Sequence, residues 1–562
     1  MNPVNEDIVA DYVIVGAGTA GCVLANRLSA GGQHKVVLIE AGGRDRHPFI
    51  HIPAGFLRLL DHPSITWGYK TAPEAQASER EILFPRGRGL GGSSSINGLL
   101  YVRPFAADIN AWEAGGAAGW NFDNCLPYYC RSETWQDGKD PRRGSDGPIQ
   151  VTRVSSPPAV CAQVMRAGEE LGLERVDDPN INTRGSSIWY YQQTRQGRFR
   201  SSAARGYLWP VASRTNLSVH TDLQVTQVMM EGEGPQRTAT GVACRRESGQ
   251  IVSVRARREV ILSAGVIGTP RLLELSGIGD PQVLDNAGIR PQVALRGVGN
   301  NLQDHYVTRL CFRIKGIGTA NERAHGVALA GEVAKYLVSG DGILTYSAAV
   351  IGAFASTGLV DRPDVQFVIA PGSFKEGRIG ELEDEPGLSL GVWQMRPESR
   401  GEVHITSSDD SMAPTIAPCY LSDSLDRQTV IAGLRIGREL ARQPALMPYV
   451  VSETVPGPQA ATDKALLQYA RDNGSTVYHG VGTCRMGADP AEGAVVDANL
   501  RVHGVKRLRV IDGSVMPTMT STNTNATVLM IAERAADLLL NELLQADQTV
   551  QQPVAQQARH AV

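Results

Sequence analysis

The sequence lacks several features that would assign a protein class directly. None of its eight cysteines belongs to a C-x-x-C pair, so neither a zinc site nor a disulfide framework is indicated. No apolar run reaches about 18 residues, and the acidic start MNPVNEDIVADY lacks the pattern of a signal peptide. We therefore expect reduced cysteines, no metal site and a cytoplasmic protein without a membrane span.

An excess of charge of one sign is also missing. The 562 residues include 55 Lys and Arg and 58 Asp and Glu, a formal net charge of −3, and no long run of like charge. Such a chain has no basic field that would attract nucleic acid, so we do not expect nucleic acid as a partner. The length is too great for a single core, which predicts two or more lobes.

The N-terminal region has the pattern of a βαβ unit. A β-branched run at residues 12–15 predicts a strand, apolar positions between residues 20 and 28 at helical spacing predict a helix, and a second β-branched run at 36–39 predicts another strand. The order strand, helix, strand is typical of a doubly wound α/β sheet.

A glycine-rich turn lies between the first strand and the helix. Gly16, Gly18 and Gly21 form G-x-G-x-x-G, and Glu40 ends the second strand. The turn brings the N–H groups of a helix terminus to a pyrophosphate, and the acidic residue accepts ribose hydroxyls, which favours NAD or FAD over NADP. The alternative is a glycine-rich turn without a ligand.

A second glycine-rich segment, RGRGLGGSSSINGLLYVR, spans residues 86–103. Its backbone N–H groups and hydroxyls could lie along a large polar ligand, but the same composition suits a flexible loop. The residues alone leave both interpretations open, and with them the choice between FAD and NAD.

Taken with four further motifs, these segments resemble the glucose-methanol-choline oxidoreductases, which are FAD-dependent alcohol oxidases and dehydrogenases. The further motifs are SAGVIGTPRLLELSGIG (263–279), GVGNNLQDH (297–305), VYHGVGTCRMG (477–487) and VIDGSVMPTMTSTNTNATVLMIAE (510–533). The resemblance covers nearly the whole chain and is closest to the bacterial choline dehydrogenase and alcohol dehydrogenase branch.

The resemblance implies an α/β fold with a Rossmann-like FAD-binding lobe and a substrate lobe that has an antiparallel sheet and helices. The FAD lobe is expected from segments 8–155, 205–310 and 466–545, and the substrate lobe from 156–204 and 311–465. The Gln-rich residues 546–562 are expected to form a disordered tail.

The resemblance also implies the active-site residues. His479 is expected to be the catalytic base beside the flavin, and Asn523 its partner that donates to the developing oxyanion. Without the resemblance, the expected roles would be a structural hydrogen-bonding residue for His479 and a turn-capping residue for Asn523. The residues expected to bind the cofactor are Gly16, Gly18, Thr19, Ala20, Gly21, Glu40, Ala41, Gly91, Gly92, Ser93, Asn97, Gly98, Val225, Ala264, Asp512, Gly513, Asn525 and Thr527.

Two departures from the family pattern refine the expectation. Ile96 stands where some members carry the histidine that binds FAD covalently, so the FAD is expected to be non-covalent. Val350 stands where choline-type members carry a glutamate, which favours a neutral, fairly apolar alcohol.

The predicted reaction is oxidation of a primary alcohol to an aldehyde by hydride transfer to FAD. The alternatives are a choline dehydrogenase, a redox-silent hydroxynitrile lyase and an NAD-dependent enzyme. The electron acceptor, whether oxygen, a quinone or another carrier, stays open, as does the oligomeric state. A loose association with the inner membrane stays open as well. The resemblance places residues 326–358 near a membrane or a dimer surface, and a plain buried helix is the alternative.

Overall fold

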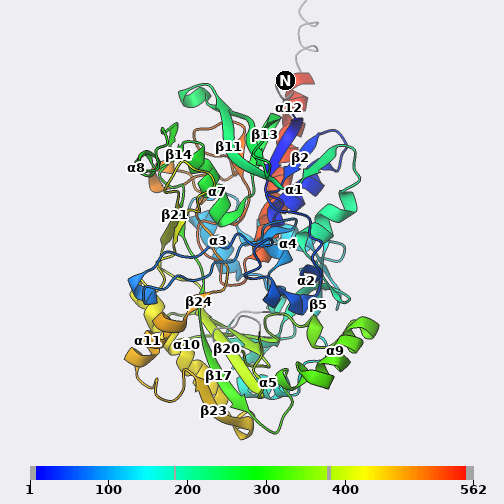
Figure 1. Cartoon of the computed structure of the whole chain (residues 1–562), viewed down its shortest axis with the longest axis vertical. Helices are drawn as coiled ribbons and strands as arrows, with labels where there is room; N and C mark the ends of the chain where they lie inside the picture. The colour runs from blue at the N-terminus through cyan, green and yellow to red at the C-terminus, as the bar shows by residue number, and fades with distance from the viewer. Residues whose placement is uncertain (1–7, 183–184, 376–380, 552–562) are drawn as a thin grey trace, which may run out of the picture.

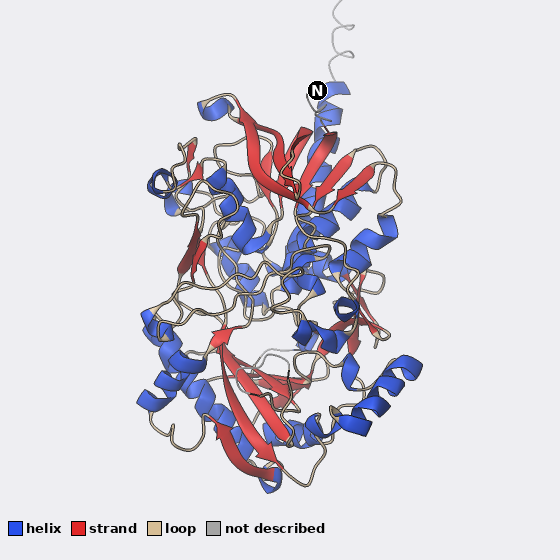
Figure 2. Cartoon of the chain, in the orientation of Figure 1, coloured by secondary structure: helices blue, strands red, loops and turns tan. Residues whose placement is uncertain are grey.

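The computed structural model describes residues 8–182, 185–375 and 381–551, which fold into two lobes stacked along the long axis of the molecule (Figure 1). One lobe surrounds a largely parallel sheet, and the other surrounds an antiparallel sheet (Figure 2). We call them the parallel-sheet lobe and the antiparallel-sheet lobe.

The parallel-sheet lobe is organised by a seven-stranded sheet in the described part of the chain. Its central strands are buried on both faces, as expected for parallel strands between layers of helices. Across the sheet the order is β10 (Leu217–His220), β2 (Val36–Ile39), β1 (Ile8–Val15), β13 (Ile251–Leu262), β12 (Thr238–Arg246) and β11 (Leu223–Glu231), with β25 (Leu508–Val510) beside β13. The pairs β11–β12 and β12–β13 are antiparallel and the other pairs of described strands are parallel, so the sheet is mixed.

The helices of this lobe include α1 (Thr19–Ser29), α4 (Phe122–Ser132), α7 (Gly265–Leu275) and α12 (Asn525–Gln551). Helix α12 packs against both α1 and α4. It also continues through residues 546–551, which were expected to begin a disordered tail. The rest of the expected tail, 552–562, lies outside the described residues.

The antiparallel-sheet lobe has an eight-stranded sheet among the described residues. The order is β23 (Val450–Val455), β17 (Tyr306–Ile314), β20 (Gly387–Gln394), β19 (Val365–Ala370), β18 (Ile351–Ala355), β7 (Ser187–Tyr190) and β6 (Glu174–Arg175), with β24 (Ser475–Thr476) beside β17. Helix α10 (Ser424–Arg442) packs on β17 and β20, and α5 (Val160–Glu170) packs on β6 and β7. Helix α11 (Asp463–Asn473) packs beside α10.

A smaller sheet lies where the two lobes meet. It contains β3 (Leu100–Tyr101), β8 (Gln192–Gln196), β5 (Ile149–Arg153) and β4 (Glu133–Trp135), with β9 (Phe199–Arg200) paired to β8. Nearby, α9 (Gly326–Ser339) buries only Tyr336, and Val327 and Val338 are 90% and 85% exposed. The alternative of a plain buried helix for this stretch is therefore wrong.

The hydrophobic cores follow the same division. The larger core draws on residues within 10–151, 203–298 and 481–539, and the second core draws on 160–188 and 306–470. Ala77 and Ile82 also belong to the second core, so the N-terminal part of the chain contributes to both lobes. The domain bounds given above stay a prediction.

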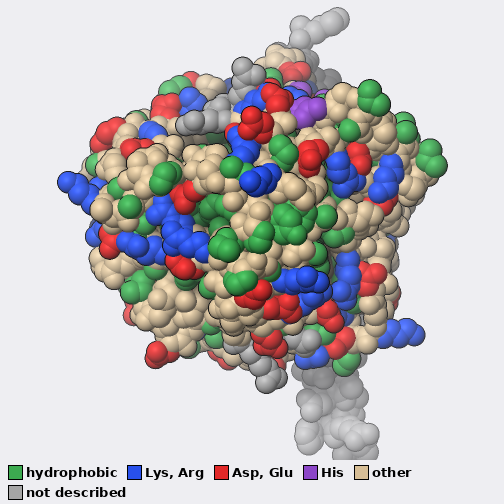
Figure 3. Space-filling model, turned by 90° about the horizontal axis from the view of Figure 1, so that it is seen from below, with side chains coloured by type: hydrophobic (Ala, Val, Ile, Leu, Met, Phe, Trp, Pro, Cys, Tyr) green, Lys and Arg blue, Asp and Glu red, His purple; other side chains and the backbone are tan. Residues whose placement is uncertain are grey.

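The surface at the antiparallel-sheet end carries acidic and basic side chains interspersed with apolar ones (Figure 3). This face therefore shows no broad field of one sign. Within the described ranges, no helix combines the length and the apolar character needed to cross a bilayer.

Candidate active site

A cavity of about 1130 Å³ extends between the two lobes, large enough for a dinucleotide together with a small substrate. Most of the residues predicted from the sequence line it. They are His479, Asn523, Gly16, Gly18, Thr19, Ala20, Glu40, Ala41, Gly92, Ser93, Asn97, Gly98, Val225, Ala264, Asp512, Gly513 and Asn525.

The first wall of the cavity is the turn between β1 and α1. Gly16 has φ of +98°, and a Cβ there would lie 2.5 Å from the Ser263 carbonyl oxygen, so only glycine fits. Gly18 caps α1 without a side-chain hydrogen bond, and a Cβ at Gly18 would meet no protein atom closer than 3.9 Å. The open space and the free N–H groups at this helix terminus suit an anionic ligand.

Glu40 lies at the end of β2 and is 7% exposed. One carboxylate oxygen accepts from the backbone N–H of Ala17 at 2.9 Å, and the other accepts from those of Gly42 and Gly89 at 2.8 and 2.9 Å. Burial raises the pKa of this carboxyl, and the three N–H groups oppose the rise. A carboxylate has about four acceptor positions, so one remains for a ligand hydroxyl.

The segment of residues 86–98 forms the second wall. Gly92 lies directly against the first turn, because a Cβ on Gly92 would be 2.7 Å from the Gly18 Cα. Ser93 faces the cavity, and Ile96 packs with Ile50, Leu59 and Ile65. Two glycine-rich segments that are distant in the sequence therefore meet around the same space.

The N-termini of helices α12 and α7 form a third wall of the cavity. Asn525 starts α12, and its side-chain oxygen accepts from the Thr19 hydroxyl at 3.0 Å, which joins the starts of α1 and α12. Asp512 accepts from the backbone N–H of Gly265 at the start of α7 and from that of Ser514, each at 2.8 Å. These helix starts direct positive dipole ends at the cavity.

The walls together fit an anionic dinucleotide. They provide helix N-termini and glycine backbone for a pyrophosphate, a carboxylate for ribose hydroxyls, and side-chain amides for a planar polar ring. Among the described residues, no group of three or more His, Cys, Asp or Glu is arranged to hold a metal.

At the opposite end of the cavity, His479 is buried between two polar partners. Its Nε2 lies 3.0 Å from Asn523 Nδ2, and its Nδ1 lies 2.9 Å from His305 Nδ1. Its backbone N–H donates to Asp304 at 2.8 Å, and Asp304 also accepts from Tyr420 at 2.5 Å and from Thr476. The histidine is thus fixed by its backbone and by both ring nitrogens.

These contacts determine where the protons lie. The Nε2 of His305 is 2.8 Å from the carbonyl oxygen of Met395, which can only accept. His305 therefore donates from Nε2 and accepts at Nδ1, and His479 donates from Nδ1. The Nε2 of His479 is left as an acceptor, which receives a hydrogen bond from Asn523.

Burial lowers the pKa of both imidazoles. For His305 it lowers the pKa to about 3. For His479, burial lowers the pKa well below the usual value of 6.5, and the neighbouring His305 and Arg86 lower it further. His479 is therefore a neutral imidazole over the ordinary pH range.

The antiparallel sheet forms the rest of the cavity. Alternate residues of β17 and β20 face it, among them Val307, Gly391 and Trp393, as the two-residue period of a strand requires. The Trp393 ring lies 5.9 Å from the ring of His479. The lining of the cavity as a whole is more apolar than polar, and the aromatic ring of Trp393 bounds the space beside His479.

Val350 does not take part in this wall. It is 1% exposed within the second hydrophobic core, and Ala348 lines the cavity instead. The interpretation that Val350 faces the substrate is therefore wrong. A displacement of two residues along the motif, in the chain that precedes β18, separates Val350 from the residue that lines the cavity.

Three residues predicted to bind the cofactor do not line the cavity. Gly21 serves close packing instead, because a Cβ there would lie 1.9 Å from the Gly16 carbonyl oxygen. The backbone N–H of Gly91 donates to Ala17, which joins the two glycine-rich segments. The Thr527 hydroxyl is fully buried and forms a hydrogen bond with the Tyr129 hydroxyl at 3.0 Å, away from the cavity lining.

The roles of His305 and Asp304 were not predicted from the sequence, although both residues belong to the GVGNNLQDH segment. The sequence feature that could have indicated a role is the Asp-His pair directly before β17, a strand with alternating apolar and polar residues. Its importance depends on the pairing of Tyr306 in β17 with Thr476 in β24, which brings the pair to the loop of His479.

Family models and similar proteins of known sequence all indicate one family for this chain. A family model described as GMC oxidoreductase matches residues 10–307, and its C-terminal counterpart matches residues 397–532. The chain is 38% identical over 545 residues to an alcohol dehydrogenase [acceptor] of Pseudomonas putida, covering 95% of this chain and 96% of that protein. It is 37% identical over 544 residues to an oxygen-dependent choline dehydrogenase of Vibrio vulnificus (strain YJ016), covering 95% and 94%.

Two solved structures have the same fold as this chain over nearly their whole length. A pyridoxine 4-oxidase from Mesorbium loti superposes with a TM-score of 0.84 at 28% identity, over 94% of this chain and 99% of that one. A variant of formate oxidase from Aspergillus oryzae RIB40 gives a TM-score of 0.89 at 26% identity, over 96% and 99%. The expected fold and the expected enzyme class, an oxidoreductase, are confirmed, and the chain belongs to the GMC oxidoreductase family.

Proposed function

We propose that the protein is an FAD-dependent enzyme that oxidises a primary alcohol to an aldehyde. The observation that carries the proposal is the neutral His479, whose acceptor Nε2 lies beside Asn523 at the end of a cavity that fits a dinucleotide. The names of the relatives, an alcohol dehydrogenase and choline dehydrogenases, support the same chemistry.

FAD would be held along the three walls described above. Gly16, Gly18 and the start of α1 suit its pyrophosphate, Glu40 suits its adenosine ribose, and the residues from Gly92 to Gly98 suit the flavin side. Bound FAD supplies the acceptor for a hydride from the alcohol carbon. Ile96 has no nucleophilic nitrogen and is packed among apolar residues, which supports non-covalent attachment.

His479 would take the hydroxyl proton of the alcohol at Nε2. An alkoxide releases hydride far more readily than a neutral alcohol, and a positioned base typically contributes about 10²–10⁴-fold. His305 holds His479 in the required tautomer through the 2.9 Å contact between the two Nδ1 atoms. No rotation of the imidazole is needed before proton transfer.

Asn523 would stabilise the negative charge on the substrate oxygen. Its Nδ2 carries two N–H groups, of which one donates to His479 and the other is available to the alcohol oxygen. As the proton moves to His479, the amide remains in place as a donor to the alkoxide. The two residues thus divide the work of proton removal and charge stabilisation.

The apolar and aromatic groups near His479 support a neutral alcohol as substrate. Choline remains a second candidate, because the choline dehydrogenase of Vibrio vulnificus is nearly as similar as the alcohol dehydrogenase. The acidic residues that line this side of the cavity, Glu81 and Glu383, are already paired with Lys70 and Arg313. A cytoplasmic location remains a prediction, and the electron acceptor and a peripheral membrane association stay open.

The visible spectrum of the purified protein tests this function. We expect a flavin band that survives gel filtration in native buffer, is released by denaturation, and is bleached by primary alcohols in the absence of oxygen. Choline in the same panel distinguishes the two substrate classes. A colourless protein would contradict the FAD proposal, and a flavin that no alcohol bleaches would favour the redox-silent lyase.

A further inference from the structure

Arg200 is a buried cation that lacks a counter-ion. It ends β9, is 1% exposed, and makes no ion pair with any acidic side chain of the described ranges. Its Nε donates to the carbonyl oxygen of Ile50 at 2.8 Å, and its Nη2 has no hydrogen-bond partner in the part of the chain that the structure describes. Burying an unpaired charge is costly, so an arginine in this position needs an explanation beyond packing.

The remaining nitrogen of Arg200 is directed at the segment that forms the second wall of the cavity. Nη1 donates to the side-chain oxygen of Asn97 at 2.6 Å, to its carbonyl oxygen at 2.8 Å and to the carbonyl oxygen of Ser94 at 3.3 Å. The 2.6 Å contact is short, as expected for a charge-assisted hydrogen bond.

This contact sets the orientation of Asn97. The same side-chain oxygen also accepts from the backbone N–H of Leu99 at 3.1 Å, so both of its acceptor positions are used on the protein side. Asn97 lines the cavity, and its Nδ2 has no protein acceptor among the described residues. The amide nitrogen is therefore the polar group that Asn97 offers to a ligand.

We propose that Arg200 is a positioning residue that orients and polarises the Asn97 amide, so that a strengthened N–H donor faces the flavin and favours its negatively charged reduced form. This inference rests on the proposed function. In the reaction, a hydride carries two electrons and one hydrogen from the alcohol carbon to the flavin, and the hydroxyl proton goes to His479. The flavin gains one net negative charge, and the charged guanidinium behind the amide lowers the free energy of that state.

The test is the midpoint potential of the bound flavin, measured by dye-coupled titration in the absence of substrate. For Arg200→Met we expect the reduction equilibrium to become at least tenfold less favourable, a shift of about 30 mV to lower potential for a two-electron couple. Arg205→Met is the matched control. Arg205 is also a cation near this segment, but it stacks on the rings of Phe199 and Trp209, and its removal should leave the potential unchanged.

The Asn97 amide provides the second comparison. Asn97→Ala should lower the potential in the same direction, and the double variant with Arg200→Met should fall less than the sum of the two single effects, because both act through one donor. A purely structural arginine would weaken flavin retention or thermal stability and leave the potential of the remaining flavin unchanged. That result overturns the proposal.

If Arg200→Met retains no flavin, Asn97→Ala alone decides, and an unchanged potential in that variant overturns the proposal. The outcome is separate from that for alcohol oxidation, because the potential needs neither substrate nor His479. An enzyme that failed to oxidise alcohols but bound flavin would still give a measurable potential.

Discussion

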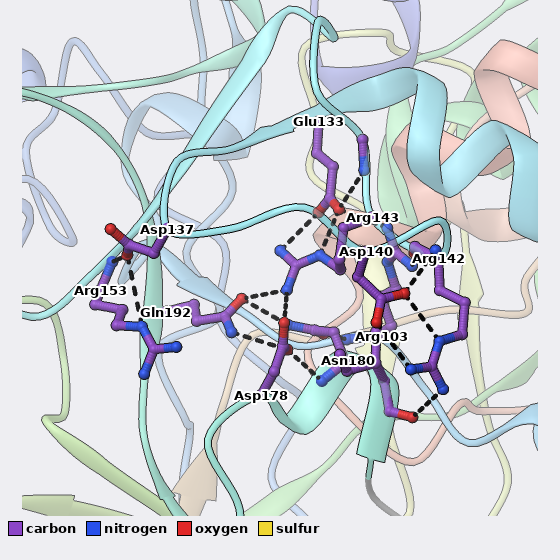
Figure 4. Close-up of polar contacts among 12 residues, drawn as sticks. Arg103, Glu133, Asp137, Asp140, Arg142, Arg143, Arg153, Asp178, Asn180 and Gln192 are labelled. Carbon is purple, nitrogen blue, oxygen red and sulfur yellow. Dashed lines mark hydrogen bonds and ion pairs between the residues drawn. The ribbon is translucent and has the colours of Figure 1, made fainter.

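The molecule contains two groups of buried polar side chains that differ in whether their charges are paired. In the first, Glu133 lies between Arg103 and Arg143, and Arg143 continues to Asp178 (Figure 4). All four of these side chains are at most 8% exposed, and their formal charges cancel. The second cluster, around the cavity, contains two neutral histidines and an arginine that makes no ion pair within the described ranges.

The comparison teaches how to separate structural from functional polar groups. Burial by itself raises the pKa of Glu133, but Arg103 and Arg143 outweigh it and hold that pKa below its usual value. Around the cavity, burial lowers the pKa of His479, and the neighbouring His305 and Arg86 lower it further. The charges of the first cluster are paired within it, although Arg103 Nε has no hydrogen-bond partner among the described residues, whereas no carboxylate of those residues forms an ion pair with Arg200 in the second.

The largest effect is expected from His479→Ala. Removal of the base should lower kcat/KM for a primary alcohol by about 10²–10⁴-fold, because the hydroxyl proton then has no positioned acceptor. The flavin absorbance should remain, since His479 is predicted to bind substrate and not the cofactor. Steady-state kinetics and the visible spectrum measure both. A fully active variant would contradict the assignment.

The next effect concerns the compensated cluster. Glu133→Gln leaves Arg103 and Arg143 buried without their shared anion, and the free energy of unfolding should fall by about 3–5 kcal/mol. Denaturant unfolding of the purified variant measures the change. Glu81→Gln is the control, because its partner Lys70 is 57% exposed and such surface pairs contribute little. An equal free energy of unfolding for the two variants would contradict the prediction that the buried Glu133 pairs contribute more to stability than the exposed pair.

A smaller effect is expected for His305→Gln. The substitution removes the imidazole that fixes the tautomer of His479 without touching the substrate, and orienting partners of this kind typically contribute about 10–100-fold. The loss should appear in kcat, with little change in flavin absorbance. An unchanged kcat would show that His479 finds its tautomer without His305.

The smallest effect is on pH dependence. Because burial lowers the pKa of His479, the neutral base persists on acidification, and kcat/KM should stay level from neutral pH to below 6.5 before it falls. The stability of the fold, unlike the activity, is expected to change as soon as the pH falls below 6.5. The unfolded chain binds the proton more readily than the folded one, so stability should decrease as the pH falls below the usual histidine value. A midpoint for kcat/KM at or above pH 6.5 would contradict this environment for His479.

The sequence predicted best what local patterns encode. The turn of Gly16 and Gly18, the acidic end of β2 at Glu40, and the roles carried by whole motifs all rest on neighbouring residues. The pairing of His305 with His479 could not be derived, because it joins residues 174 positions apart through the register of β17 and β24. The assignment of Val350 was also wrong, because the chain before β18 brings Ala348 and not Val350 to the cavity.

The buried arginines show a further limit of sequence reasoning. Arg103, Arg143 and Arg200 look alike in the sequence, yet two are neutralised by carboxylates and one is not. Whether a charge is compensated depends on contacts between elements that are distant in the chain, such as β9 and the segment before β3. Composition and periodicity carry no information on such contacts.

The protonation state of the two histidines tests the account most directly. We would record ¹⁵N NMR spectra of the histidine-labelled enzyme near neutral pH and assign the two rings by comparison with His479→Ala and His305→Gln. The account predicts two neutral rings, His305 protonated on Nε2 and His479 protonated on Nδ1, with the Nε2 of His479 free to accept. A protonated imidazolium at His479, or a proton on its Nε2, would contradict its role as the base.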